Sequence, residues 1–207
     1  MLYDYLIRQY KAGEPIFCMD IEIDGMSEVN LRQQFKVLAD SGKLIRYEKG
    51  IYYIPKKNRL NESGAPAADT VAYYKYISRS NGVNGYYSGH TFANQIGVSA
   101  QVPFKVEIVS NNIAAKKREI SIGKRIFVIR KAVISVTEKN YKVLQLLDLL
   151  KNLDSYIDDN VADVKEKLND YITRSHISRE DIDEYIFNYP DSTFRYFYEM
   201  GLDHVLP

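Results

Sequence analysis

The clearest pattern of apolar and polar positions lies in the first quarter of the chain. Leu31, Phe35 and Leu38 recur at spacings of four and three residues, which places them on one face of a helix. Ser27 precedes this pattern and can accept a hydrogen bond from a free backbone N–H of the first turn. Gly42 follows it and can adopt the left-handed conformation that ends a helix. The pattern predicts a capped helix with one buried face.

Two short β-prone runs follow this helix, Leu44–Tyr47 and Ile51–Ile54, and Gly50 lies in the break between them. Such runs around a glycine-containing turn predict a hairpin. Upstream, the pattern predicts an amphipathic helix with Leu2, Leu6, Ile7 and Tyr10 on its apolar side, a small strand at Ile16–Phe17, and a brief helix at Met19–Ile23.

This order of elements is that of a winged helix–turn–helix, which we place at residues 1–57. The alternative is an αββ piece of some other small domain. Residues 58–68 are polar and contain glycine and proline, which indicates a linker. Residues 69–207 form the expected second domain. The predicted fold class is therefore α+β: an N-terminal winged helix–turn–helix, then a mixed α/β domain with a helical, acidic C-terminal part.

In the second domain, alternation and helical spacing predict a series of elements. Helices are expected at residues 67–80, 89–96, 137–153, 159–174, 178–189 and 192–198, and strands at 104–109, 120–122 and 125–131. Residues 133–136 either extend the last of these strands or form a fourth. Thr137 and Ser178 are the expected caps of two of these helices.

Charge separates by face on the capped helix. When the apolar side chains of this helix face inward, its amide and cationic side chains point sideways or outward. These are the kinds of side chain that reach base edges and phosphates in a major groove. Residues 31–60 hold eight Lys or Arg against two acids, a net of +6. The predicted DNA-binding residues are Ser27, Asn30, Arg32, Gln33 and Lys36 on the helix, and Arg46, Lys49 and Tyr52 on the hairpin.

Composition adds that the whole chain carries a net charge of only +1. The distribution is uneven: residues 151–207 hold six Lys or Arg against thirteen Asp or Glu, a net of −7. This asymmetry suggests different partners for the two ends. Cys18 is the one cysteine, so neither an internal disulfide nor a cysteine metal cluster is expected. No signal-peptide pattern or long apolar run is present, which predicts a cytoplasmic protein that does not enter a membrane.

No catalytic constellation emerges. Residues 86–90 read Tyr-Tyr-Ser-Gly-His, which lacks the first glycine of a nucleophile elbow. His90, His176 and His204 stand far apart, and no spacing matches a metal site, a calcium loop or a phosphate loop. We expect no catalytic residue, metal or cofactor, and no enzyme activity.

Three segments carry a resemblance to a known family. They are residues 46–55 (Arg-Tyr-Glu-Lys-Gly-Ile-Tyr-Tyr-Ile-Pro), residues 88–99 (Ser-Gly-His-Thr-Phe-Ala-Asn-Gln-Ile-Gly-Val-Ser), and Gln101-Val102-Pro103 leading into a strand and Ser110-Asn111-Asn112. In these the chain resembles AbiEi-type antitoxins, the antitoxin-and-repressor components of abortive-infection (type IV) toxin–antitoxin systems. Ile96 and Val98 stand where that pattern favours Leu.

The resemblance implies a DNA-binding domain that represses its own operon, and a second domain that counteracts a nucleotidyltransferase-like toxin. The expected DNA partner is double-stranded DNA of its own operator, arranged as inverted repeats. Two alternatives stay open. One is a protein-interaction module whose winged helix binds a protein. The other is a nuclease in the central domain, near whose strands the acids are Glu107 and Glu119.

Overall fold

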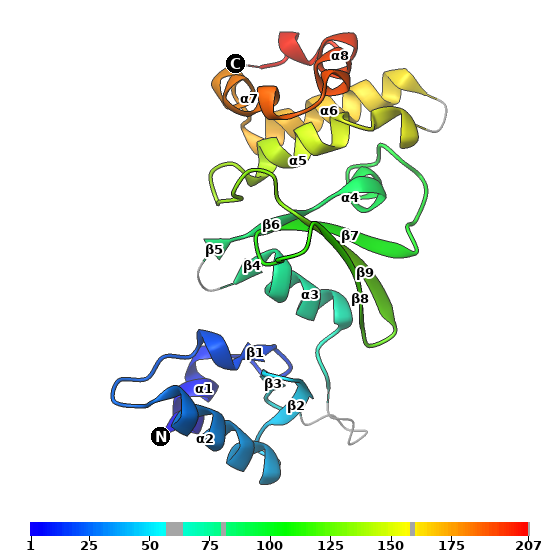
Figure 1. Ribbon diagram of the computed structural model, residues 1–207. Coiled ribbons are helices and arrows are strands. Elements are labelled where there is room, and N and C mark those ends of the chain that lie inside the picture. The colour runs from blue at the N-terminus through cyan, green and yellow to red at the C-terminus, as the bar shows by residue number, and fades with distance from the viewer. Residues whose placement is uncertain (57–63, 80–81, 158–159, 207) are drawn as a thin grey trace. The chain divides into compact units, whose positions relative to one another are not determined.

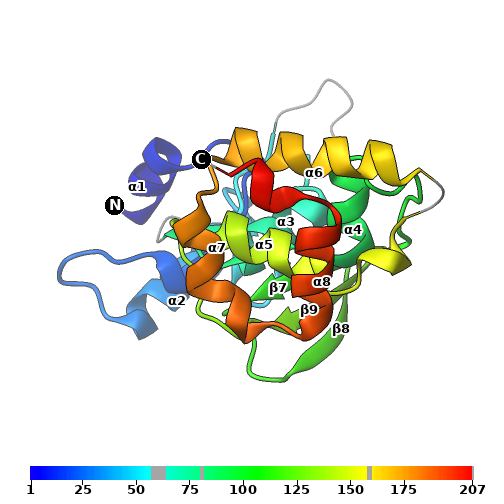
Figure 2. The same ribbon diagram turned by 90° about the horizontal axis from the view of Figure 1, so that it is seen from above.

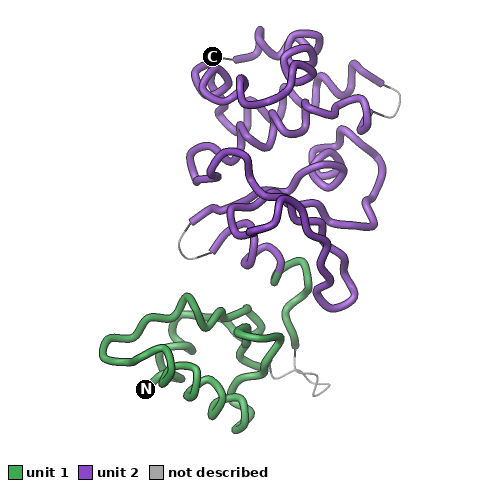
Figure 3. Tube along the Cα trace, viewed as in Figure 1, with its two compact units in different colours: residues 1–71 green, residues 72–207 purple. Residues whose placement is uncertain are grey.

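The computed structural model describes residues 1–56, 64–79, 82–157 and 160–206 of a mixed α+β protein (Figure 1). The chain divides into two compact units, Met1–Val71 and Ala72–Pro207 (Figure 3). The division falls within helix α3 (Ala68–Tyr76), beyond the predicted linker at 58–68, most of which lies outside the described residues. Each unit has a hydrophobic core of its own.

The first unit combines two helices with a three-stranded antiparallel sheet. Its elements are α1 (Leu2–Gln9), β1 (Ile16–Phe17), the 3₁₀ turn η1 (Cys18–Asp20), α2 (Glu28–Asp40), β2 (Ile45–Glu48) and β3 (Ile51–Tyr53). The strand order β1-β3-β2 places β3 in the centre. The predicted first helix, small strand, capped helix and hairpin are confirmed. Leu31 and Phe35 of α2 join Leu2, Leu6 and Ile16 in the core.

Two details of this unit were predicted wrongly. The brief helix expected at Met19–Ile23 is only the single 3₁₀ turn η1, and Ile21 after it is extended and buried. Acidic and isoleucine residues alternate from residue 20 to 24, and this two-residue period favours extended chain over helix. Ile7 is exposed on α1 and lies outside the buried face, which Leu2 and Leu6 form.

The second unit is built on a four-stranded sheet of order β6-β7-β9-β8. The strands are β6 (Gly85–Tyr87), β7 (Lys105–Ser110), β8 (Lys117–Ile122) and β9 (Arg125–Lys131). β7 and β9 are parallel, and the other two pairings are antiparallel. β7, β8 and β9 were predicted, although β8 starts earlier than expected. β6 was missed, and no strand forms at residues 133–136.

The helix expected at residues 67–80 ends earlier, at Tyr76, and Ser78–Arg79 (β4) then pairs with Gly82–Val83 (β5). Hydrogen bonds from other segments explain this end. The Ser110 hydroxyl donates to the carbonyl oxygen of Tyr76 at 2.5 Å, and the backbone N–H of Asn84 donates to the carbonyl oxygen of Ile77 at 2.6 Å. These carbonyls are therefore satisfied without a further helical turn.

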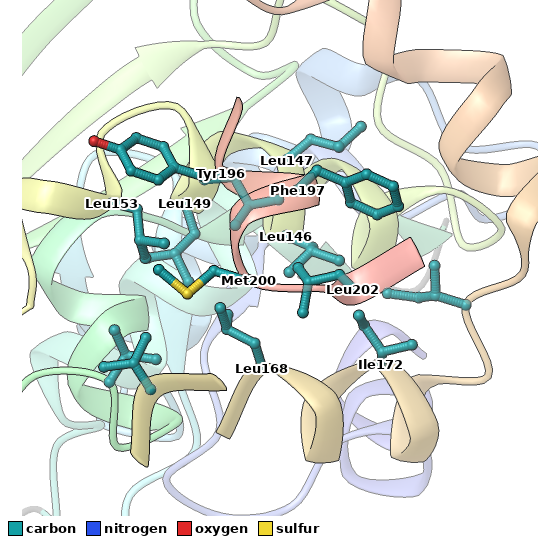
Figure 4. Close-up of a cluster of buried hydrophobic side chains, with 14 of the residues drawn as sticks. Leu146, Leu147, Leu149, Leu153, Leu168, Ile172, Tyr196, Phe197, Met200 and Leu202 are labelled. Atoms are coloured by element: carbon teal, nitrogen blue, oxygen red, sulfur yellow. The ribbon is translucent and has the colours of Figure 1, made fainter. Parts of the chain in front are cut away.

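Helices cover the sheet on the side opposite α3 (Figures 1 and 2). They are α4 (Gly89–Gln95), α5 (Tyr141–Leu150), α6 (Val161–Ser175), α7 (Arg179–Tyr185) and α8 (Asp191–Glu199), with 3₁₀ turns η2 (Leu153–Ser155), η3 (Ile186–Asn188) and η4 (Leu202–His204). Every residue of α5 from Val143 to Leu150 is buried, because α5 lies beneath the outer helices. Leu146 and Leu149 of α5 meet Leu168 of α6 and Phe197 of α8 in the largest core (Figure 4).

Two helix starts test the capping predictions. The box at Ser178 is confirmed: its hydroxyl accepts from the backbone N–H of Asp181, whose carboxylate accepts from the backbone N–H of Ser178. Thr137 is not the cap of α5, which begins at Tyr141. Instead the Asn140 side chain accepts from the Thr137 backbone N–H at 2.8 Å and closes a turn before the helix.

Candidate nucleic-acid interface

Helix α2 separates a buried face from an exposed one. Leu31 is 6% exposed and Phe35 is fully buried against the rest of the first unit's core. The four residues predicted to contact DNA from this helix all lie on its exposed face: Asn30, Arg32, Gln33 and Lys36. Amide and cationic side chains presented together on one helix can read base edges and bind phosphates in a major groove.

Ser27 begins this helix. Its side-chain oxygen lies 3.3 Å from the backbone nitrogen of Asn30, from which it accepts a hydrogen bond. This contact satisfies one of the free N–H groups of the first turn and fixes where the exposed face begins. Ser27 is itself exposed.

Arg32 is held by an ion pair along the helix. Its guanidinium lies 2.9 Å from the carboxylate of Glu28, one turn earlier, and both side chains are largely exposed. Such exposed pairs contribute only about 0.2–1 kcal/mol. A phosphate group can therefore replace Glu28 as the partner of Arg32 at little cost.

The hairpin presents two further cations. Arg46 and Lys49 are exposed, and the Arg46 Nε donates to the carbonyl oxygen of Glu48 at 3.4 Å. The β2–β3 register shifts between Arg46 and Glu48, and Gly50 closes the turn with φ of +78°. A positive φ of this size favours glycine. The turn therefore fixes the position of Lys49 beside Gly50.

Tyr52, the eighth predicted contact, lies elsewhere. It is only 9% exposed, and its ring centroid is 5.1 Å from that of Phe35. β3 is the central strand, and all three of its residues are buried. Burial is also the main cause of the raised pKa of Tyr52. We therefore place Tyr52 in the core beneath α2 and outside the predicted contact surface.

Arg32 and Arg46 come from different elements, and the positive charges of both act on the thiol of Cys18. Burial raises the pKa of the Cys18 thiol to about 11, while the positive charges of Arg32 and Arg46 act in the opposite direction. Both guanidinium groups are thus close enough to Cys18 to influence its ionisation.

Sequence reasoning missed two residues of the exposed helix face. Val29 is 75% exposed and Val37 is 58% exposed, although both are apolar. The signal was present, because both fall outside the spacing of Leu31, Phe35 and Leu38. Apolar side chains on such a face can contact thymine methyl groups or a protein partner.

Positive charge is concentrated in one part of the first unit. Described residues 1–56 hold eight Lys or Arg and eight Asp or Glu, a net of zero. Six of the acids lie at or before residue 28, whereas residues 31–56 hold six cations and two acids. Lys57 and Arg59, which add to the predicted basic segment, lie outside the described residues. Attraction for a polyanion would therefore depend on the α2 and hairpin surface.

The residues weighed for catalysis lie in the second unit. The His90 backbone N–H donates to the carboxylate of Glu107 at 3.2 Å, and the His90 ring packs edge-on against Tyr156. Glu119 forms an ion pair with Lys105 at 2.6 Å. Glu107 and Glu119 lie on strands either side of β9, two strand spacings or roughly 10 Å apart. The two acids each have a separate partner and do not form a carboxylate pair.

Among the described residues, no group of three or more His, Cys, Asp or Glu side chains gathers where it could hold a metal ion. None of the helices in the described part of the chain has the length and apolar character needed to cross a membrane.

Comparison with known proteins places the chain in a family. A family model described as "Family of unknown function (DUF6088)" matches residues 4–180, most of the chain. The chain belongs to this family. The DUF6088 match includes α2, the hairpin and the four-stranded sheet, and it ends within α7, so α8 lies beyond it. No curated protein matches this DUF6088 protein. The family description assigns no activity, so the resemblance to AbiEi-type antitoxins stays a prediction.

Proposed function

We propose that this DUF6088 protein is a DNA-binding transcriptional repressor and the antitoxin of an abortive-infection toxin–antitoxin system, acting in the cytoplasm. The observation that carries the proposal is the exposed face of α2, which presents Asn30, Arg32, Gln33 and Lys36 together. The first unit has the order helix, short strand, 3₁₀ turn, helix and hairpin. This order supports a winged helix–turn–helix in which η1 stands in the place of the second helix. In that arrangement the capped helix enters the major groove and the hairpin lies along the neighbouring backbone.

The residues divide by role within this proposal. Asn30 and Gln33 read base edges, since amide side chains pair with adenine in the major groove. Arg32, Lys36, Arg46 and Lys49 bind phosphates or guanine. Arg32 and Lys36 are exposed on α2, and Arg46 and Lys49 are exposed on the hairpin that follows it, which supports a cationic surface shared by the two elements. The partner is the duplex of its own operator, with inverted repeats read by two copies of the chain.

The antitoxin role is assigned to the second unit. It rests on the resemblance to AbiEi-type antitoxins and on the acidic C-terminal helices, which suit contact with a basic protein surface. The proposed target is a nucleotidyltransferase-like toxin, counteracted by contact or through its effect in the cell.

The experiment is an operator titration with the double variant Arg32→Ala, Lys36→Ala. Both side chains are exposed, so the fold should be retained. Loss of two phosphate contacts should weaken binding at least tenfold and reduce the salt slope by about two charges. A matched control, Lys165→Ala with Lys167→Ala on the exposed side of α6, removes the same charge and should leave the affinity unchanged. The proposal fails if the two double variants bind the operator equally well.

A second candidate function rests on the exposed Val29 and Val37. If α2 docks a protein partner, the variant Val29→Ser, Val37→Ser should abolish binding to that partner. DNA affinity would then be no better than nonspecific for the unsubstituted protein. Specific operator binding that survives these two substitutions favours the repressor.

A further inference from the structure

A second concentration of positive charge lies on the sheet of the second unit, distant in sequence from α2. Residues 105–131 hold eight Lys or Arg against two acids. Seven of these cations are exposed: Lys105, Lys116, Lys117, Arg118, Lys124, Arg125 and Lys131. We call these seven residues the strand cations. They lie on β7, on β8 and β9, and in the connections beside them.

Most of the strand cations have no acidic partner. Lys105 pairs with Glu119, and Arg125 has contacts of its own. Lys116, Lys117, Arg118, Lys124 and Lys131 take part in none of the ion pairs found among the described residues. An unneutralised row of this kind is an electrostatic surface for a polyanion.

β8 is also an edge strand, because the sheet order ends with it. Lysines on an edge strand protect it against pairing with another strand, and this alone would explain some of the charge. It does not explain the exposed aromatic side chain that directly precedes β7. Phe104 is 79% exposed and directly precedes Lys105.

The strand register places this ring at the same end of the sheet as three of the strand cations, Lys105, Lys124 and Arg125. The other four lie toward the far end of β8 and β9. Lys105 on β7 is opposite Ile126 on β9, and the strands are parallel. The residues just before each, Phe104 on one strand and Lys124–Arg125 on the other, therefore share one end of the sheet. Val102, which is 83% exposed, precedes Phe104 and widens the exposed apolar surface there.

We propose that this end of the sheet binds single-stranded nucleic acid. A base stacks on the exposed ring of Phe104, and the strand cations bind the phosphates that follow it along β8. Aromatic stacking beside a cationic track is how proteins hold single strands without sequence preference, whereas bases in a duplex present no free face to the ring. This inference is independent of the proposed operator binding, since its residues belong to another unit.

The test is fluorescence anisotropy with a labelled 12-nucleotide single strand, as RNA and as DNA of the same sequence, and with the corresponding DNA duplex. The protein is the full chain carrying Arg32→Ala and Lys36→Ala, so that α2 contributes little. We expect either single strand to bind more tightly than the duplex. A preference for RNA or for DNA identifies which of the two is the natural ligand.

Two variants examine the two parts of the surface. Phe104→Ala should weaken single-strand binding about tenfold or more, the usual effect of losing one stacked base. Its control is Phe187→Ala, which removes an equally exposed ring in the acidic half. Lys117→Gln with Lys124→Gln should lower the salt slope by about 1.4, and Lys139→Gln with Lys165→Gln is the charge-matched control.

Three results would overturn the proposal. The first is duplex binding equal to or tighter than single-strand binding. The second is equal loss of affinity in a variant and its control. The third is no single-strand binding at all, with a dimer at low salt that Lys117→Gln and Lys124→Gln abolish. That result would assign the strand cations to the acidic helices of a second copy.

Discussion

At the residue scale, the ionisation of the one cysteine of the chain is influenced by two arginines on which the DNA-binding proposal depends. Burial raises the pKa of Cys18 above its ordinary value of 9.0, and the charges of Arg32 and Arg46 lower it, for a result of about 11. Because the folded pKa exceeds the unfolded one, the protonated thiol favours folding below pH 9. That contribution is lost as the pH rises from about 9 to about 11.

This position makes Cys18 a reporter of DNA binding. Alkylation requires the thiolate, so at pH 8.5 the native protein should react more slowly with iodoacetamide than the urea-unfolded protein. Operator DNA should slow the reaction further, because phosphates neutralise the arginines that favour the thiolate. The measurement is the alkylation rate by mass spectrometry. A rate that DNA leaves unchanged, while binding is saturated, would place the DNA away from Arg32 and Arg46.

At the element scale, elements with a clear period could be predicted from sequence. The spacing of Leu31, Phe35 and Leu38 located α2, and the capping box at Ser178 located α7. The errors arose where tertiary contacts decide. α3 ends at Tyr76 because Ser110 and Asn84 bind the carbonyls that follow, and β6 pairs with β7 despite being only three residues long. Neither contact leaves a local signal.

The candidate site divides in the same way. The exposed positions on α2 followed from helical geometry, since the inward residues fixed the outward ones. The burial of Tyr52 could not be predicted, because a three-residue strand with two tyrosines shows no alternation of apolar and polar positions. The central position of β3 in the sheet comes from its pairing with β1. The influence of both Arg32 and Arg46 on the Cys18 thiol depends on tertiary packing that no sequence spacing reveals.

The helical layer of the second unit makes a stability prediction. Leu168 on α6 is fully buried among the side chains of the largest core, so Leu168→Ala should lower the free energy of unfolding by about 2–5 kcal/mol. Val161 on the same helix is 56% exposed, and Val161→Ala should change it by no more than about 0.5 kcal/mol. Urea unfolding measures both. Equal effects would mean that α6 does not pack as described.

At the scale of the whole molecule, charge distinguishes the proposed roles. The basic segment at residues 31–56 belongs to the first unit, the strand cations to the sheet of the second, and the acidic excess to the helices after residue 151. The net charge of +1 conceals this division. Each surface suits a partner of a different chemistry: an operator duplex, a single strand, and a basic protein.

The measurement that tests the central claim most directly is a titration of the pure protein against its own upstream DNA and a scrambled duplex, at two salt concentrations. A repressor should bind the upstream DNA far more tightly than the scrambled duplex at both concentrations, since base contacts persist when phosphate attraction is screened. Weak, equal and salt-sensitive binding to both duplexes would contradict it. The α2 surface would then be a nonspecific cationic face. Docking of a protein partner on Val29 and Val37 would explain the exposed face of α2 better than operator binding.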